Sequence, residues 1–234
     1  MSAEQSIALK RYFKEHPEDI SAVVPFDKGS DELHPLNFTA SNTELDPAIL
    51  EDTEAFSDWV RLELASENCR YGIGGYNEHR TIYSRSALFD MDEEPRRLHL
   101  GVDIWGPKGT PVFSPLSGKI HSFRFNNNFG DYGATLILEH QAENLIFHTL
   151  YGHLKLSSID GLVKDLPVKK GQMIAEFGDI IDNGHWPPHL HFQLIFDMGN
   201  FEGDYPGVCR YSERELFLSN CPDPELILKH TFRY

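Results

Sequence analysis

The sequence predicts a mainly β fold with an N-terminal helical extension. From about residue 80 onward, short apolar runs such as GATLILEH and HLHFQLIF alternate with Gly, Pro and Asn turns. That rhythm is typical of an antiparallel β-sandwich or barrel. In the earlier part of the chain, the apolar residues between Phe56 and Leu64 follow helical spacing instead. We therefore expect a helical and loop extension over residues 1–80 and a β domain with a C-terminal tail over residues 81–234.

Composition and charge limit the classes of partner. The 234-residue chain carries a formal net charge of -15 at pH 7. Such a chain repels polyanions, so we expect no nucleic-acid binding. No stretch approaches the roughly 20 apolar residues of a membrane-spanning helix. The first 16 residues carry charge throughout and lack the apolar core of a secretory signal, which predicts a cytoplasmic protein. Composition predicts no oligomeric state.

The first segment that contains candidate metal ligands is Leu98–Trp105, LHLGVDIW. A single strand over these residues would turn its aliphatic side chains to one face and His99 and Asp103 to the other, with the small Gly101 between them. A histidine and a carboxylate on one face are candidate ligands for a divalent metal ion. An H-x-x-x-D pattern also occurs by chance, so its weight depends on two further segments with the same alternation.

The second segment is Pro188–Phe196, PHLHFQLIF. Here His189, His191 and Gln193 share one face of the expected strand, and the apolar residues share the other. Two histidines that are two residues apart on a strand point the same way and can serve one site. Three segments that each separate polar and apolar residues onto opposite faces, as these two and the next one do, are much less likely to occur by chance than one.

The third segment is Leu145–Leu156, LIFHTLYGHLKL. The same two-residue period places Tyr151 and His153 together on one face and His148 on the other. We therefore expect His153 in the site, with Tyr151 beside it, and His148 outside it.

These residues, in this order, resemble the M23 zinc metallopeptidases of the lysostaphin or LytM type. The resemblance covers roughly residues 85–200, about half of the chain. Its motifs are His99-Leu-Gly-Val-Asp103, the run GTPVFSPLSG that begins at Gly109, Tyr151-Gly-His153, Lys170-Gly-Gln, and Pro188-His-Leu-His191-Phe. The resemblance implies an antiparallel β fold of the M23 (duplicated hybrid motif) type, with a groove across a zinc ion.

The resemblance also implies roles for five residues. His99, Asp103 and His191 correspond to the zinc ligands, and His153 and His189 correspond to the catalytic pair. Three protein ligands leave a position for water, as catalytic zinc sites require. The chain contains no H-E-x-x-H helix, so the two histidines must take the role of the glutamate base found in other zinc peptidases.

The resemblance implies a zinc-dependent endopeptidase acting on a peptidoglycan-type peptide or on a small intracellular peptide. The loop Asp182–Pro188 contains a bulky Trp186 and paired prolines. In this respect it resembles the loop of M23-like domains that are fused to aminotransferase and phosphotransferase modules in soluble proteins. Two other functions stay open: a non-catalytic zinc-binding or regulatory module on the same fold, and a histidine phosphocarrier. The phosphocarrier needs no carboxylate ligand, so the presence of Asp103 argues against it.

Candidate substrate contacts lie in two places. Tyr151 could donate a hydrogen bond beside His153. The glycine-rich segment Tyr71–Arg80 either simply connects the helical part to the first strand or wraps the backbone near the groove. In the second case, Asn77 and Arg80 are the residues that would contact substrate.

Overall fold

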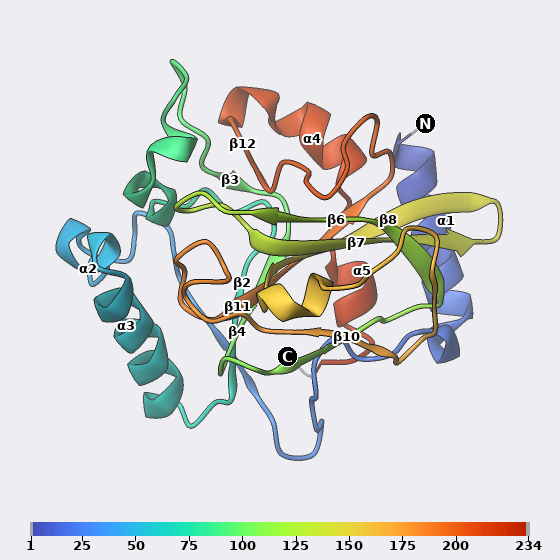
Figure 1. Ribbon diagram of the computed structural model, residues 1–234, viewed down its shortest axis with the longest axis horizontal. Helices are drawn as coiled ribbons and strands as arrows, with labels where there is room; N and C mark the ends of the chain where they lie inside the picture. Colours follow the sequence, from blue (N-terminus) through green and yellow to red (C-terminus); the bar gives the residue numbers. More distant parts are fainter. Residues whose placement is uncertain (1, 233–234) are drawn as a thin grey trace.

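The computed structural model describes residues 2–232 and is built around one eight-stranded sheet (Figure 1). Only the pair β1–β2 is parallel, and every other pair in the sheet is antiparallel. The strands, in spatial order, are β1 (Leu33–Pro35), β2 (Tyr71–Gly74), β4 (Val102–Trp105), β11 (His189–Ile195), β8 (Leu145–Leu154), β7 (Gly133–Ala142), β6 (Gly118–Asn126) and β9 (Pro167–Val168). The predicted mainly β, antiparallel fold is thus confirmed.

Two small two-stranded sheets complete the β structure. One pairs β10 (Met173–Glu176) with β5 (Pro111–Phe113), and the other pairs β12 (Val208–Cys209) with β3 (Leu98–His99). The short β3–β12 sheet matters for function because it carries His99 outside the main sheet.

Helices lie at both ends of the chain. They are α1 (Ser2–Glu15), α2 (Pro47–Glu51), α3 (Thr53–Ser66), α4 (Arg214–Asn220) and α5 (Glu225–Leu228), with 3₁₀ turns η1 (Pro17–Asp19), η2 (Ile82–Arg85), η3 (Ala87–Phe89), η4 (Leu156–Ile159) and η5 (Tyr211–Glu213). Helix α3 begins where Asp52 accepts hydrogen bonds from the backbone N–H groups of Glu54 and Ala55, as an N-cap does. Among the described residues, no helix is both long and apolar enough to cross a membrane.

The first 80 residues contain the expected helices and also contribute to the sheet. Strands β1 and β2 extend it beyond β4, and β2 pairs with β4 so that Gly74 lies opposite Asp103. The extension therefore supplies two strands at one edge of the main sheet, next to β4. The division into two domains at residue 80 stays a prediction.

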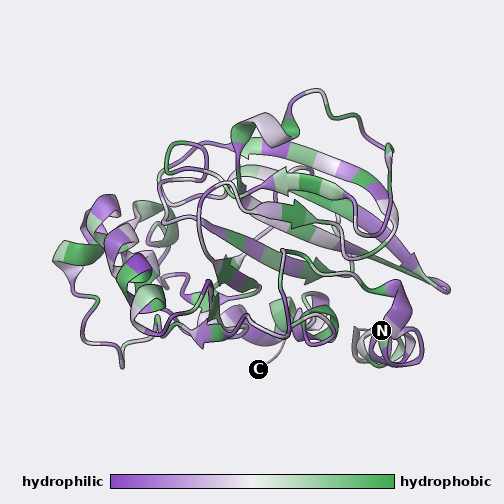
Figure 2. Ribbon diagram, turned by 90° about the horizontal axis from the view of Figure 1, so that it is seen from below, coloured by the Kyte–Doolittle hydropathy of each residue, from purple (hydrophilic) through white to green (hydrophobic). Residues whose placement is uncertain are grey.

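The two faces of the sheet bury different clusters. On one face, Phe192 and Leu136 belong to the same buried cluster as Leu9 and Phe13 of α1. The long strands alternate hydrophobic and hydrophilic residues along their length (Figure 2), as expected when the two faces of a sheet have different surroundings. The polar positions of β4 and β11 lie on the second face, and this is where the candidate site forms.

Candidate metal centre

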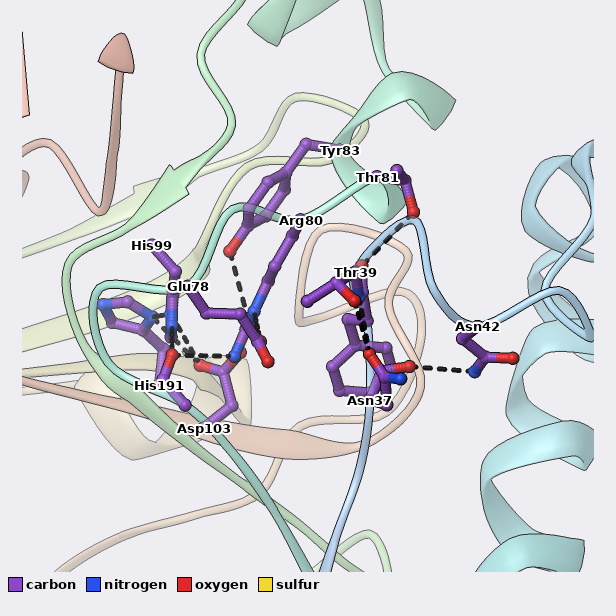
Figure 3. Close-up of polar contacts among 12 residues, drawn as sticks. Asn37, Thr39, Asn42, Glu78, Arg80, Thr81, Tyr83, His99, Asp103 and His191 are labelled. Carbon is purple, nitrogen blue, oxygen red and sulfur yellow. Dashed lines mark hydrogen bonds and ion pairs between the residues drawn. The ribbon is translucent and has the colours of Figure 1, made fainter. Parts of the chain in front are cut away.

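Three side chains from three strands converge on one point (Figure 3). His99 Nε2 lies 3.0 Å from His191 Nδ1, and Asp103 Oδ1 lies 3.1 Å from His191 Nδ1 and 3.3 Å from His99 Nε2. Over residues 2–232, this is the one group of three or more His, Cys, Asp or Glu side chains whose ligating atoms lie within 4.8 Å of one another. Cross-strand pairing explains part of the convergence, since His191 lies directly opposite Asp103.

The second ring nitrogen of each histidine has a partner that fixes the tautomer. His99 Nδ1 donates to the carbonyl oxygen of Gly75 at 2.9 Å, and His191 Nε2 donates to Gln193 Oε1 at 2.8 Å. The Gln193 amide is oriented by its own donation to the carbonyl oxygen of Pro206 at 3.1 Å. His99 Nε2 and His191 Nδ1 therefore both carry lone pairs where they meet.

Two lone pairs and a carboxylate oxygen that face one another repel unless a proton or a cation lies among them. Histidines that bind metals commonly donate their other ring N–H to a carbonyl or amide oxygen, as both do here. The donor set, two imidazole nitrogens and one carboxylate oxygen, suits zinc. The residues present thus fit a divalent metal ion.

Charge states favour the same conclusion. Burial, and then the neighbouring Arg80 guanidinium, lower the pKa of His99 to about 4, so its imidazole is neutral at pH 7. Burial alone would raise the pKa of Asp103, but His99 and Arg80 hold it well below its usual value. A neutral imidazole and an ionised carboxylate are the forms that bind metal.

The expectation of one continuous strand over Leu98–Trp105 is wrong. The strand breaks at Leu100–Gly101, so Leu98 and Leu100 join a cluster on one face while Val102 and Ile104 join the cluster on the other. His99 and Asp103 still meet because the chain bends at the break. Gly101 permits this, since a Cβ there would lie 2.7 Å from the His191 ring.

Residues 97–201 match the family model described as Peptidase family M23. These residues belong to peptidase family M23. All five residues given roles by the resemblance lie inside the M23 segment, whereas Gly75 and Arg80 lie before it.

Named relatives match about half of the chain. The DD-carboxypeptidase/endopeptidase Mpg of Neisseria meningitidis is 32% identical over 126 residues, which cover 51% of this chain and 26% of Mpg. The peptidoglycan DD-endopeptidase ShyB of Vibrio cholerae is 35% identical over 97 residues, which cover 42% of this chain and 20% of ShyB. The chain thus spans about a quarter or less of the length of these relatives. Among solved structures, lysostaphin from Staphylococcus simulans is 29% identical with a TM-score of 0.38, covering 57% of this chain and 44% of lysostaphin.

The two histidines that the resemblance assigns to catalysis, His153 and His189, pack together beside the three candidate ligands. The ring centroids of His153 and His189 are 4.0 Å apart, and His189 stacks on Trp105 at 3.9 Å. Each donates its Nδ1–H to a backbone carbonyl oxygen: His153 to Asn183 and His189 to Pro187, both at 2.7 Å. Each Nε2 therefore carries a lone pair. Burial lowers the pKa of His189 to about 4 and that of His153 well below its usual value.

His153 reaches this position by an irregularity in its strand. The residue has a left-handed backbone (φ 62°) at the end of β8, where the pairing with β7 shifts register between Ala134 and Leu136. The expectation that Tyr151 and His153 share a face is therefore wrong. Tyr151 lies opposite Phe192 in the apolar cluster, and its hydroxyl bonds Thr149 Oγ1 at 3.0 Å. A two-residue period fails at such a bulge.

A cavity of about 170 Å³ lies beside the candidate metal ligands and the two candidate catalytic histidines. Its inner wall is formed by Asp103, His153, His189 and His191. The remaining wall is largely aromatic and aliphatic, and its members include Tyr83, Phe89, Tyr132, Trp186, Phe201 and Val208. An apolar pocket with a few convergent polar groups is typical of a ligand site.

The three expected substrate contacts lie away from this wall. Arg80 is fully buried behind Asp103, and Asn77 Oδ1 accepts a hydrogen bond from Arg214 Nε at 2.9 Å. Tyr151 packs in the core. Their assignment as substrate contacts stays an untested prediction. Gln193 lies on the face of β11 that the sequence predicts, and its bond to His191 is a functional contact that was not predicted; its position two residues after His191 was the available signal.

Proposed function

We propose that this chain is a zinc-dependent metallopeptidase that hydrolyses an amide bond in a peptidoglycan-type peptide. The observation that carries the proposal is the meeting of His99 Nε2, His191 Nδ1 and Asp103 Oδ1, with both outer ring nitrogens bonded to oxygen acceptors. The M23 family match supports a peptidase, and the names of Mpg and ShyB support the substrate class.

His99, Asp103 and His191 would hold the ion. A zinc ion supplies Lewis acidity, which polarises a carbonyl group and lowers the pKa of water toward neutrality. The three side chains come from β3, β4 and β11; burial keeps the His99 imidazole neutral, and the Arg80 guanidinium helps to keep the Asp103 carboxylate ionised against the effect of burial on its pKa. The protein thus presents the ligands in the state that binding requires.

His189 and His153 would move the protons. Each keeps its Nε2 lone pair free because its Nδ1–H is held by a backbone carbonyl, and both side chains line the cavity. A neutral imidazole accepts a proton from the attacking water and, once protonated, stabilises the developing oxyanion or protonates the leaving amine. The stacking on Trp105 holds the His189 ring in place.

Elemental analysis and a peptide assay test the proposal together. We expect about one zinc per chain in the wild type, and loss of that zinc in His99→Ala, Asp103→Ala and His191→Ala. The zinc-loaded wild type should then release peptides from cell-wall fragments. A small-peptide panel run in parallel distinguishes a peptidoglycan substrate from a small peptide of another kind.

Each contrary result has a distinct meaning. A wild type that binds no zinc after reconstitution would overturn the metal assignment. A wild type that binds stoichiometric zinc but cleaves neither substrate would instead favour the non-catalytic binding module. Retention of stoichiometric zinc by His191→Ala would show that His191 is not a ligand.

A further inference from the structure

Arg80 lies on the far side of Asp103 from the two histidines (Figure 3). Its side chain is fully buried, with 0% exposure. Its Nη1 donates to Asp103 Oδ2 at 2.5 Å, while Asp103 Oδ1 faces His99 and His191. The two oxygens of this carboxylate are therefore divided between the arginine and the candidate metal position.

The guanidinium is held on every side by its own contacts. Its Nε donates to Glu78 Oε2 at 2.6 Å, Nη2 donates to the carbonyl oxygen of Gly75 at 3.3 Å, and Nη1 also reaches the Tyr83 hydroxyl at 3.3 Å. Its carbon atom lies 5.3 Å from the centre of the Phe38 ring. A planar, multiply bonded guanidinium keeps a fixed orientation, which a lysine ammonium cannot reproduce.

The chain makes room for this group next to β4. Gly74 lies opposite Asp103 in the sheet, and a Cβ at Gly74 would lie 2.6 Å from Arg80 Nη2. The next residue, Gly75, uses one carbonyl oxygen to accept from both His99 Nδ1 and Arg80 Nη2. A single short segment thus contacts two of the three candidate ligands, although it lies before the M23 segment.

We propose that Arg80 is a positioning residue that fixes Asp103 as a one-oxygen metal ligand. This inference rests on the proposed function, because it requires a metal ion at His99, Asp103 and His191. Arg80 occupies Oδ2 and so leaves Oδ1 alone to face the ion. Glu78 offsets the positive charge of the arginine beside a divalent cation and holds the other edge of the guanidinium. Without Arg80, the carboxylate is free to rotate or to present both oxygens.

The test is zinc affinity of the metal-free protein, measured by competition with a chromogenic chelator. Arg80→Met retains an unbranched apolar side chain but removes the guanidinium. We expect the zinc Kd of this variant to rise by about 10- to 100-fold. Arg80→Lys should lie between the wild type and Arg80→Met. Arg85→Met is the matched control: Arg85 is a partly buried arginine five residues later that binds Thr53 and lies over the Trp186 ring instead of contacting Asp103.

Cobalt substitution supplies a readout that a purely structural role would not move. If Asp103 presents both oxygens in Arg80→Met, the visible absorption of the cobalt-loaded protein should weaken as the coordination number rises, while Arg85→Met should keep the wild-type spectrum. Glu78→Gln, which leaves the arginine in place, gives a milder second variant if Arg80→Met fails to fold, and we expect a smaller rise in its Kd.

The outcomes separate this inference from the proposed function. A folded Arg80→Met protein with wild-type zinc affinity and cobalt spectrum would overturn the positioning role and leave the metal site intact. For an unfolded Arg80→Met, wild-type affinity and spectrum in both Glu78→Gln and Arg80→Lys would overturn it. A wild type that binds no zinc would remove the proposed function and this inference with it.

Discussion

Gln193 Oε1 lies 2.8 Å from Nε2 of His191, two residues earlier on β11. The glutamine is itself fully buried, and its amide also donates to Pro206 and to Cys221 Sγ. This amide therefore sets which nitrogen of His191 carries the lone pair that faces Asp103.

Gln193→Met should weaken zinc binding by about 10- to 100-fold, because His191 then loses the acceptor that fixes its tautomer. Gln193→Glu keeps an oxygen at the same position and should retain more of the affinity. Chelator competition on the metal-free proteins measures both values. Equal zinc affinities for the wild type and Gln193→Met would show that the tautomer needs no partner.

His189→Ala should keep one zinc per chain and lose at least about 100-fold in kcat, because general acid–base groups contribute about 10²- to 10⁴-fold. His153→Ala should behave likewise, since the two rings pack together on the cavity wall. His79→Ala is the control, because His79 is an exposed histidine on a neighbouring segment. Full activity in His189→Ala would place the proton-transfer role elsewhere.

Gly101→Ala should destabilise the fold by about 1–3 kcal/mol, the range for overpacking a buried position. The added Cβ would lie 2.7 Å from the His191 ring and 2.8 Å from the backbone oxygen of Phe192, so both must shift. Urea unfolding of the metal-free protein measures the change. Gly75→Ala is the control, since its Cβ would meet nothing nearer than Glu78 Oε1 at 3.7 Å. Equal stabilities for the two variants would contradict the steric argument.

His140 should make stability depend on pH independently of the metal site. Burial lowers its folded pKa to about 4, whereas an unfolded histidine has a pKa near 6.5. The folded state thus binds fewer protons than the unfolded state between these values. Stability is full above about pH 6.5 and falls as the pH drops towards 4, by about 2 kcal/mol at pH 5.

His140→Gln removes this titration. The free energy of unfolding of the variant should therefore change less between pH 7.5 and pH 5 than that of the wild type. Urea unfolding of the metal-free wild type and variant at pH 7.5 and pH 5 gives the comparison, and subtracting the two proteins cancels the other histidines. The glutamine can still bond Thr149, which His140 Nε2 contacts at 2.7 Å. An identical pH dependence in both proteins would show that His140 binds its proton equally well in the folded and unfolded states, which would contradict a lowered folded pKa.

Local alternation in the sequence predicted the β fold and placed His189 and His191 on one face, but it also placed Tyr151 beside His153, where the structure does not have it. The H-x-H pair on β11 behaves as a two-residue period requires, because this strand is regular and paired on both sides. The same reasoning failed at two irregular points: the break at Gly101 and the left-handed His153. Bulges and bends depend on how neighbouring strands pack, and a period of two carries no information about them.

Spacing and resemblance in the sequence were enough to select the five residues to which we propose to assign the chemistry: His99, Asp103, His153, His189 and His191. The groups that hydrogen-bond to these side chains became visible only in the tertiary structure. Arg80 is 23 residues from Asp103 along the chain, and the Gly75 carbonyl is 24 residues from His99. Contacts of this kind depend on β2 lying beside β4, a pairing set by the packing of the whole sheet, whereas side-chain alternation is a property of one strand.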